Sequence, residues 1–568
     1  MIIGLDVGGT HTDVVLIGEG SIQRQVKVPT QHSNLFECVW NGLEQVTKDI
    51  PPQTIRRAVL STTLTTNAIA EGKLSRTAMI VSAGPGVNPE NFRIGPRFYC
   101  VSGSIDHRGR EVQQIDRSEI EDIAGRLRAE GIRHVGVVSK FSVRNSAHEE
   151  KIAQILGSSF ENIVLGHRLS GNLNFPRRIA TAYLNAAVYS IHKQFFEAVK
   201  ESLSRKGLRI PIYVLKADGG TVSFESSVTA PGQTILSGPA ASVMGSLPFA
   251  SESEDTLVLD IGGTTTDMAI LVRGTPLLEP LGGEIGGYKT LIRSLRAQSI
   301  ALGGDSTIRV VEGALCIGPD RQGPAMAYGG PVPTPTDALF VLGEDSDDSA
   351  GISRRGLQPI AEQLGLTVKE TAECIFDTTC HMILASAARM IDEINAKPVY
   401  TVKELLSGYR VSPREVLVLG GPAPHFARRL ARMTDLHVHV VPQWHVANAI
   451  GAALAKSTSE VTVFADTERG FAVAPEEDFT KRIGRDFSRQ AALDLAFDLL
   501  RKKCLDAGVT ESELEMEVIE DLQFNMVRQF YTSGKNIRVK VQVKPGLIPG
   551  YRDLLGTIVD YCPLPGAI

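Results

Sequence analysis

One short sequence occurs twice in this chain and constrains the fold more than any other feature. Residues 6–13 read Asp-Val-Gly-Gly-Thr-His-Thr-Asp, and residues 260–267 read Asp-Ile-Gly-Gly-Thr-Thr-Thr-Asp. Apolar segments flank each copy, at 2–5 and 14–17 for the first and at 257–259 and 268–272 for the second. Two apolar segments joined by a glycine-rich turn predict a β-hairpin. The repeat therefore predicts two equivalent hairpins, far apart in the chain.

The residue types of the repeat suit phosphate binding. Glycines let backbone N–H groups approach an anion and permit positive φ angles, and threonine hydroxyls can donate to phosphate oxygens. We assign phosphate contact to residues of both loops: Gly8, Gly9, Thr10, Thr12, Gly262, Gly263, Thr264 and Thr266. Asp6 and Asp260, at the ends of strands, are candidate ligands of a hydrated Mg²⁺, which proteins bind through few carboxylates and many waters. Two facing hairpins would hold a polyphosphate from both sides.

Other roles are open for the same residues. A lone Gly-Gly-Thr is also typical of an ordinary tight turn, and Asp6 and Asp260 could instead bond to the hairpin ends. The two copies agree at Asp, Gly, Gly, Thr, Thr and Asp, which favours a shared chemistry. For Asp13 and Asp267 the sequence leaves two roles, support of the loop or positioning of water during catalysis.

Composition narrows the class of protein. The chain has 568 residues, enough for several domains, with a formal net charge of −5. Nucleic-acid-binding proteins usually carry a basic patch, so we expect no nucleic-acid partner. We find no signal peptide and no apolar segment long enough to cross a bilayer, so we expect no membrane association. Seven dispersed cysteines without a Cys-x-x-Cys pair predict reduced thiols and a cytoplasmic location.

Alternating strand and helix patterns predict an α/β architecture. Residues 1–28 predict three antiparallel strands, and residues 83–117, rich in Gly, Pro and Arg, predict an elaborated loop region. We divide the chain into an N-terminal lobe at 1–175, a second lobe at 176–460, and a small C-terminal α+β appendage at 461–568.

A second glycine pair follows the predicted strand at 416–419. Gly420 and Gly421 precede a helical pattern, and small residues at such a turn let an adenine or ribose lie against the backbone. The helix N-terminus would add hydrogen-bond donors. The same pattern is also typical of a plain turn.

Taken in order, these motifs resemble those of the hydantoinase A/5-oxoprolinase family of ATP-dependent enzymes, which includes N-methylhydantoinase A and acetone carboxylase-like members. Besides the two loops, the resemblance rests on residues 61–68, 178–185, 236–241 and 329–343. It covers most of the chain. It implies a two-lobed actin/Hsp70-like ATPase fold, built of duplicated ribonuclease H-like lobes around a nucleotide cleft. It also implies ATP and Mg²⁺ as cofactors and Gly420-Gly421 as the adenosine motif.

The chain departs from the family pattern at several positions. His11 stands where members usually carry Phe or Asn, and Lys-Ala-Asp-Gly-Gly at 216–220 replaces a typical Gln-Ser-Asn-Gly-Gly. These differences lie near the predicted cleft, so the substrate need not be hydantoin or 5-oxoproline. His425 resembles a histidine near the family's adenosine motif, and we assign it no role.

The resemblance implies an ATP-dependent hydrolase that opens a cyclic amide of the hydantoin or 5-oxoproline type by phosphorylating its carbonyl oxygen. The catalytic candidates are Asp6, Asp13, Asp260 and Asp267. Three alternatives stay open: a subunit of an ATP-dependent ketone carboxylase, a sugar kinase-like phosphotransferase, or an actin-like ATPase switch without a small-molecule substrate. Expected partners are a small cyclic amide or ketone and a hydantoinase B-type subunit, in a homo- or hetero-oligomer.

Overall fold

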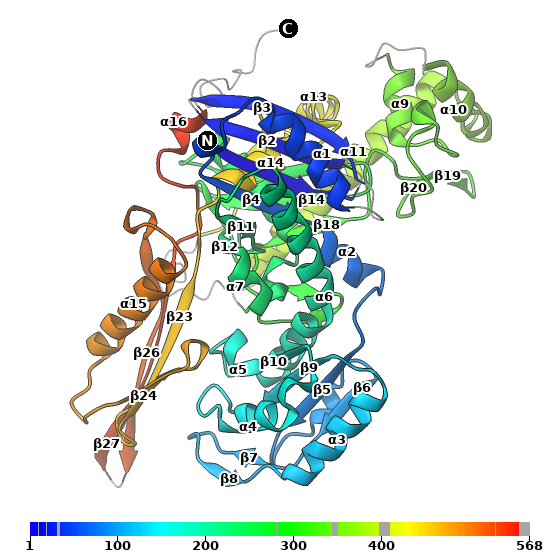
Figure 1. The fold of residues 1–568 in the computed structure, drawn as a ribbon. Helices are drawn as coiled ribbons and strands as arrows, with labels where there is room; N and C mark the ends of the chain where they lie inside the picture. Colours follow the sequence, from blue (N-terminus) through cyan, green and yellow to red (C-terminus); the bar gives the residue numbers. More distant parts are fainter. Residues whose placement is uncertain are drawn as a thin grey trace.

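The structure is a computed structural model that describes residues 1–9, 11–18, 20–30, 35–279, 281–343, 350–396, 409–528 and 530–555. Thr10, one of the predicted phosphate-binding residues, lies outside these ranges. Figure 1 shows strands β1–β3 at one end of the molecule, an α/β subdomain with β5–β10 at the other end, and the C-terminal strands alongside.

A six-stranded sheet forms around the first hairpin, in the order β12-β11-β4-β1-β2-β3. Its strands are β1 (Ile2–Val7), β2 (His11–Gly18), β3 (Ser21–Pro29), β4 (Arg57–Thr62), β11 (Ile212–Leu215) and β12 (Thr221–Ser223). The first three strands are antiparallel, as predicted, and β1, β4 and β11 run parallel. In this sheet Asp6 is paired with Asp13 across the hairpin.

A second sheet repeats this arrangement around the second hairpin. Its order is β15-β14-β13-β21-β22, and β18 also pairs with β14. The strands are β13 (Asp255–Ile261), β14 (Thr266–Val272), β15 (Thr275–Pro276), β18 (Ala297–Ile300), β21 (Pro413–Leu419) and β22 (His437–Val440). In each sheet, therefore, the first strand of the hairpin pairs in parallel with a third strand, and that strand pairs in parallel with a fourth. This shared topology confirms the prediction of two duplicated, ribonuclease H-like lobes.

The first sheet includes strands that follow residue 176, where we predict that the second lobe begins. Helix α6 (Phe175–Arg205) buries Phe196 and Val199 in the same apolar cluster as Leu5 of the first sheet. Strands β11 and β12 then complete that sheet, although both follow residue 176. The reason is that the apolar strand β11 extends the parallel edge beside β4. The chain therefore passes between the two sheets after β12 and before β13.

The region predicted as an elaborated loop contains part of a second α/β unit. A four-stranded sheet has the order β10-β9-β5-β6. Its strands are β5 (Thr77–Ser82), β6 (Arg97–Cys100), β9 (His134–Ser139) and β10 (Asn162–Leu165), and helices α3 (Arg117–Ala129), α4 (Ala147–Leu156) and α5 (Gly166–Leu169) accompany them. With the paired short strands β7 (Ser104–Ile105) and β8 (Glu111–Gln113), these elements form the β5–β10 subdomain. The sequence did not indicate β6 because four residues are too short to show a period.

The C-terminal region is an α+β domain, as predicted. Helix α15 (Arg489–Asp506) packs on a five-stranded sheet of order β25-β24-β23-β27-β26. Its strands are β23 (Glu460–Asp466), β24 (Phe471–Ala474), β25 (Phe479–Arg482), β26 (Met516–Arg528) and β27 (Tyr531–Val543). The short helix α16 (Tyr551–Leu555) then returns to the first lobe, where Leu555 is buried with Ile17. Within the described residues, no helix combines the length and apolarity that a membrane crossing needs.

Two helices pack together between the sheets. They are α8 (Ser237–Ser246) and α14 (Ala447–Leu454), and their side chains share one buried cluster with strands of both lobes. A Cβ on Gly245 would lie 2.2 Å from the Ala447 carbonyl oxygen, and a Cβ on Gly451 would lie 2.3 Å from that of Ala241. Only glycine allows this separation, so the two helices hold the lobes close together.

Candidate active site

The two glycine-rich turns have the same backbone geometry. The Gly8 N–H donates to the His11 carbonyl oxygen at 3.0 Å, and the Gly262 N–H donates to that of Thr265 at 2.9 Å. Asp260 is paired with Asp267 across its hairpin as Asp6 is with Asp13. The sequence repeat is therefore a structural repeat.

The structure brings the predicted carboxylates together. Asp6 is 6% exposed, and burial together with the negative charges of Asp13 and Asp260 raises its pKa to about 7. Burial and the charge of Asp260 likewise raise the pKa of Asp267 to about 7. Burial raises the pKa of Asp13 as well, although Lys27 lies 3.0 Å away and opposes this shift. Asn448 donates to Asp260 and also lies beside Asp6, so the first carboxylates of the two hairpins lie near one another.

One buried oxygen of Asp6 points to a missing ligand. Asp6 Oδ1 is inaccessible to solvent and has no hydrogen-bond partner among the residues that the structure describes. Ser61 and Asn448 lie close enough to Asp6 to lower its pKa in part. A buried carboxylate oxygen without a donor is costly, and a hydrated cation would satisfy it. The residues present therefore fit a Mg²⁺ ion at this position.

Two residues that sequence analysis missed hold Asp260. Ser242 of α8 donates its hydroxyl to Asp260 Oδ2 at 2.5 Å, and Asn448 of α14 donates its amide to the same oxygen at 3.1 Å. Asn448 thus lies between the carboxylates of the two lobes. Neither residue belongs to a local motif, so only the packing of α8 against α14 could reveal them.

Thr12 and Thr266, two of the predicted phosphate-binding residues, are buried and hydrogen-bonded within the protein. Both side chains are 0% exposed. The Thr12 hydroxyl bonds to the Thr30 hydroxyl at 3.0 Å, and the Thr266 hydroxyl donates to the Leu302 carbonyl oxygen at 2.7 Å. Neighbouring residues of a strand point to opposite faces, so Thr12 faces away from the site that Asp13 faces. These two hydroxyls support the hairpins and are not available to phosphate, whereas Thr264 is exposed on its loop.

A third glycine-rich segment, also missed, packs on the second loop. The Gly304 N–H donates to the Gly262 carbonyl oxygen at 2.9 Å, and the Asp305 N–H donates to that of Gly263 at 2.7 Å. A Cβ on Gly303 would lie 2.5 Å from the Gly262 carbonyl oxygen. Gly303 and Gly304 thus fix the second loop, and Asp305 lies beside it. The available signal was a Gly-Gly-Asp sequence after a strand pattern.

Segments that carried the family resemblance surround the first loop. Asn67 of α2 (Leu64–Ala70) has its amide nitrogen 3.8 Å from the position of a Cβ on Gly9. The Ser237 hydroxyl donates to the Thr62 carbonyl oxygen at 2.8 Å, which joins the start of α8 to the end of β4. Residues 61–68 and 236–241 therefore form one structural unit beside the first hairpin.

Gly420 and Gly421 have different environments. Gly420 has φ +95°, and a Cβ there would lie 2.2 Å from the Ile261 carbonyl oxygen and 2.6 Å from Asp260 Oδ1. A Cβ on Gly421 would have no neighbour within 4 Å among the described residues. Gly420 therefore allows β21 to end directly against Asp260, while Gly421 borders open space at the start of α13 (Ala423–Met433). His425 lies in the first turn of this helix.

Residues 216–220, which depart from the family pattern, include residues that line a cavity separate from the two hairpins. Lys216 Nζ is 3.2 Å from Asp218 Oδ2, and both side chains are buried. Arg293 completes this charged group, with its Nε 3.4 Å from the same Asp218 oxygen. The three residues line a cavity of ≈ 640 Å³ that the C-terminal domain also borders.

Comparison with known proteins gives the family. The family model described as hydantoinase/oxoprolinase matches residues 178–461, and the one described as hydantoinase/oxoprolinase N-terminal region matches residues 2–160. The alpha subunit of caprolactamase from Pseudomonas jessenii is 23% identical over 492 residues, covering 78% of this chain and 68% of that protein. 5-Oxoprolinase 1 from Arabidopsis thaliana is 24% identical over 515 residues, covering 77% of this chain but only 40% of that protein.

A solved structure shows the same fold over nearly the whole chain. The nucleotide-free structure of acetone carboxylase superposes with a TM-score of 0.71 at 18% identity, covering 97% of this chain and 88% of that one. This likeness agrees with the duplicated lobes and with the added C-terminal domain. The chain belongs to the hydantoinase/oxoprolinase family.

Proposed function

We propose that this chain is the ATP-dependent subunit of a hydrolase that opens a cyclic amide by phosphorylating its carbonyl oxygen. One observation carries the proposal: two Asp-Gly-Gly hairpins face each other and bring their carboxylates together. The names of relatives, caprolactamase subunit alpha and 5-oxoprolinase, support a cyclic amide as the substrate class.

The chemistry explains the need for ATP. Amide resonance and ready re-closure of the ring oppose hydrolysis of an unstrained lactam. Transfer of the γ-phosphoryl group to the carbonyl oxygen turns that oxygen into part of a leaving group, and water can then attack the activated carbon. Positioning and charge stabilisation supply most of the catalysis in such transfers.

The chain's own residues divide this work. The backbone N–H groups of the two turns would bind the phosphates, and the open space at Gly421 would take the nucleoside. Asp6 and Asp260 would hold Mg²⁺, which when bound supplies charge neutralisation at the phosphates. Ser242 and Asn448 keep Asp260 in position. Asp267, with its pKa raised to about 7, is suited to accept a proton from the attacking water at neutral pH.

The experiment is Mg-ATP turnover by the purified chain with and without 5-oxoproline, hydantoin and caprolactam, and with simple ketones plus bicarbonate. We expect one lactam to stimulate ADP release in step with ring opening, because transfer of the γ-phosphoryl group leaves ADP. Asp260→Asn should lower this turnover by at least about 100-fold, as for loss of one group that stabilises transition-state charge. Asp122→Asn, an exposed carboxylate on α3, is the matched control and should have no effect.

Other outcomes identify the alternatives. Failure to bind Mg-ATP, or full turnover in Asp260→Asn, contradicts the proposal. Stimulation by a ketone with bicarbonate indicates a carboxylase instead. Mg-ATP binding without stimulated turnover calls for a partner: the name of the caprolactamase relative as a subunit supports co-expression with a hydantoinase B-type subunit.

A further inference from the structure

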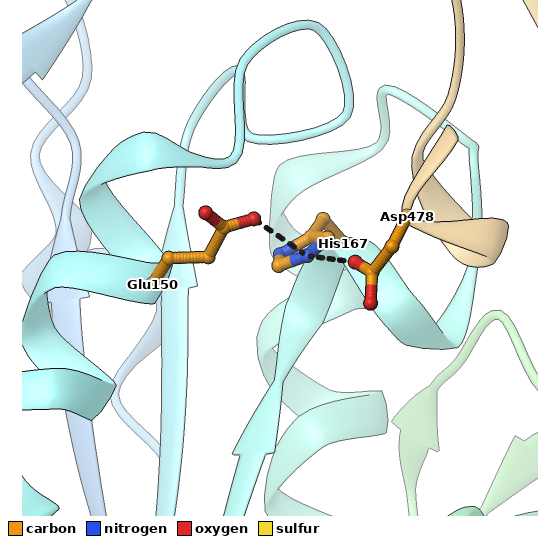
Figure 2. Close-up of side chains that lie close together, drawn as sticks. All are labelled: Glu150, His167 and Asp478. Carbon is orange, nitrogen blue, oxygen red and sulfur yellow. Dashed lines mark ion pairs between the residues drawn. The ribbon is translucent and has the colours of Figure 1, made fainter. Parts of the chain in front are cut away.

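A histidine and two carboxylates lie close together, and none of the three belongs to either hairpin. Figure 2 shows Glu150 of α4, His167 of α5 and Asp478 of the C-terminal domain around one point. His167 Nε2 lies 3.9 Å from Glu150 Oε1 and 3.9 Å from Asp478 Oδ1. All three ligand atoms lie within 4.8 Å of one another. Within the described ranges, this is the one group of three or more His, Cys, Asp or Glu residues with such spacing.

The imidazole of His167 is held with one nitrogen facing this point. Its Nδ1 bonds to Glu149 Oε2 at 2.6 Å, and both side chains are 0% exposed. The same Glu149 oxygen accepts the backbone N–H of His167 at 2.9 Å, and Glu149 Oε1 accepts that of Ser139 at 2.8 Å. With this carboxylate accepting the Nδ1 proton, the lone pair of the neutral imidazole is on Nε2. A carboxylate behind a histidine is the usual support of a metal-binding imidazole.

His167 Nε2 itself is an unpartnered buried atom. It is inaccessible to solvent and has no hydrogen-bond partner among the described residues. Its neighbours at 3.9 Å are beyond hydrogen-bond distance. Leaving a buried polar atom unpaired is costly, which indicates that a ligand belongs between this nitrogen and the two carboxylates.

Both carboxylates have a further polar partner. Ser146 donates its hydroxyl at 2.6 Å to Glu150 Oε1, the oxygen that faces His167. Arg168 Nη2 pairs with Asp478 Oδ2 at 2.9 Å, which leaves Oδ1 directed at His167. Each member of the trio therefore has a second partner that fixes its direction, as outer partners do around bound metals.

We propose that Glu150, His167 and Asp478 bind a divalent transition-metal ion of the Zn²⁺ or Mn²⁺ class. Imidazole with carboxylates suits these ions. With bonds of about 2.1 Å, ligand atoms in a tetrahedral site are about 3.4 Å apart, so each histidine–carboxylate pair needs to contract by about half an ångström from 3.9 Å. The two carboxylate oxygens already lie within 4.8 Å of each other. Three protein ligands leave positions for water or another ligand.

The position of the trio suggests what the ion does. Glu150 and His167 belong to the β5–β10 subdomain, whereas Asp478 follows η7 (Pro475–Glu477) in the C-terminal domain. The Glu476 carboxylate also accepts from the Gly171 N–H across this boundary. Glu150 and Asp478 line a cavity of ≈ 610 Å³, which gives the ion a path of entry. A bound ion would therefore join these two parts of the chain.

The test is calorimetric titration of the chelator-treated full chain with Zn²⁺, and separately Mn²⁺, without nucleotide. The titration uses the Asp6→Asn chain, which lacks one proposed ligand of the hairpin cation site, and we expect it to bind one ion of at least one of these metals. Glu150→Gln and Asp478→Asn should each weaken binding at least about 10-fold; these side chains are half exposed, so the fold should persist. Asp486→Asn, an exposed carboxylate of the same domain, is the matched control. His167→Ala should abolish binding, with circular dichroism to verify folding.

The ion should also raise the Tm of the wild type but not of Asp478→Asn. Asp6→Asn should keep the metal binding, because the nucleotide site is separate, so failure of the proposed ATP chemistry leaves this inference intact. Absence of saturable binding by the wild type, or binding that survives both carboxylate substitutions, overturns it.

Discussion

Substitution of Gly420 tests whether the end of β21 lies directly against Asp260 and the end of β13. In Gly420→Ala the new Cβ would lie 2.2 Å from the Ile261 carbonyl oxygen, whereas real Cβ contacts essentially never fall below 3.0 Å. The end of β13 must then retreat by about 0.8 Å, the difference between these distances. Asp260 moves with it, because its Oδ1 would otherwise be 2.6 Å from the same Cβ.

Two effects lower the free energy of unfolding of Gly420→Ala. A φ of +95° strains any residue with a side chain, by about 1–3 kcal/mol. Forcing an extra methyl group against packed backbone adds about 1–3 kcal/mol. We therefore expect Gly420→Ala to lower the free energy of unfolding by about 2–6 kcal/mol. Misplacing Asp260 by nearly 1 Å should lower lactam-stimulated ATP turnover by about 100-fold.

Gly421→Ala is the matched control. The same methyl group one residue later meets no described atom within 4 Å and needs no positive φ. Its free energy of unfolding should change by less than about 0.5 kcal/mol. If the nucleoside lies there, the KM for ATP rises while kcat is kept. Urea denaturation and steady-state kinetics measure both variants; equal stability of the two would refute the close approach of β21 to Asp260.

Three further predictions concern the same site. The pKa of Asp6 is raised from 3.8 to about 7, so the stability that its protonated form contributes is lost as the pH rises through 7. Between pH 5 and pH 8 the free energy of unfolding should decline about 2–3 kcal/mol more in the wild type than in Asp6→Asn. Urea midpoints that change in parallel with pH in the two proteins would contradict this. Asn448→Ala should lower ATP turnover roughly 10–100-fold through loss of a hydrogen bond to a carboxylate, whereas Ser246→Ala, which removes a bond within α8, should keep it. Thr266→Val should cost about 1–3 kcal/mol of stability but change the calorimetric Kd for Mg-ATP less than twofold; a larger change would return this hydroxyl to the phosphate site.

The repeat made the duplicated hairpins predictable from sequence. Each copy contains its own strand pattern and its own turn, so local information is enough. The same pattern could have excluded the hydroxyls of Thr12 and Thr266. Each stands next to an aspartate in its strand, and adjacent strand residues face opposite sides of a sheet. If Asp13 and Asp267 face the site, these two threonines cannot.

Other parts of the site depend on contacts that no local pattern contains. Ser242 and Asn448 are 206 residues apart and meet only because α8 and α14 pack together. The place of β11 in the first sheet is a related case. Strand β11 joins the first sheet after the whole β5–β10 subdomain has intervened, and pairing between strands so far apart cannot be deduced from periodicity.

The glycines at the contact between α8 and α14 also determine how close the carboxylates of the two hairpins lie. Gly245 and Gly451 let the two helices approach until backbone nearly touches backbone, which brings the two hairpins close enough for Asp6 and Asp260 to repel each other. A larger residue at either glycine would separate the lobes and relieve the repulsion. Buried like charges destabilise the free protein, and a cation placed between them reverses the sign of that interaction. The same close approach that costs stability would therefore be offset by the cation that we propose for Asp6 and Asp260.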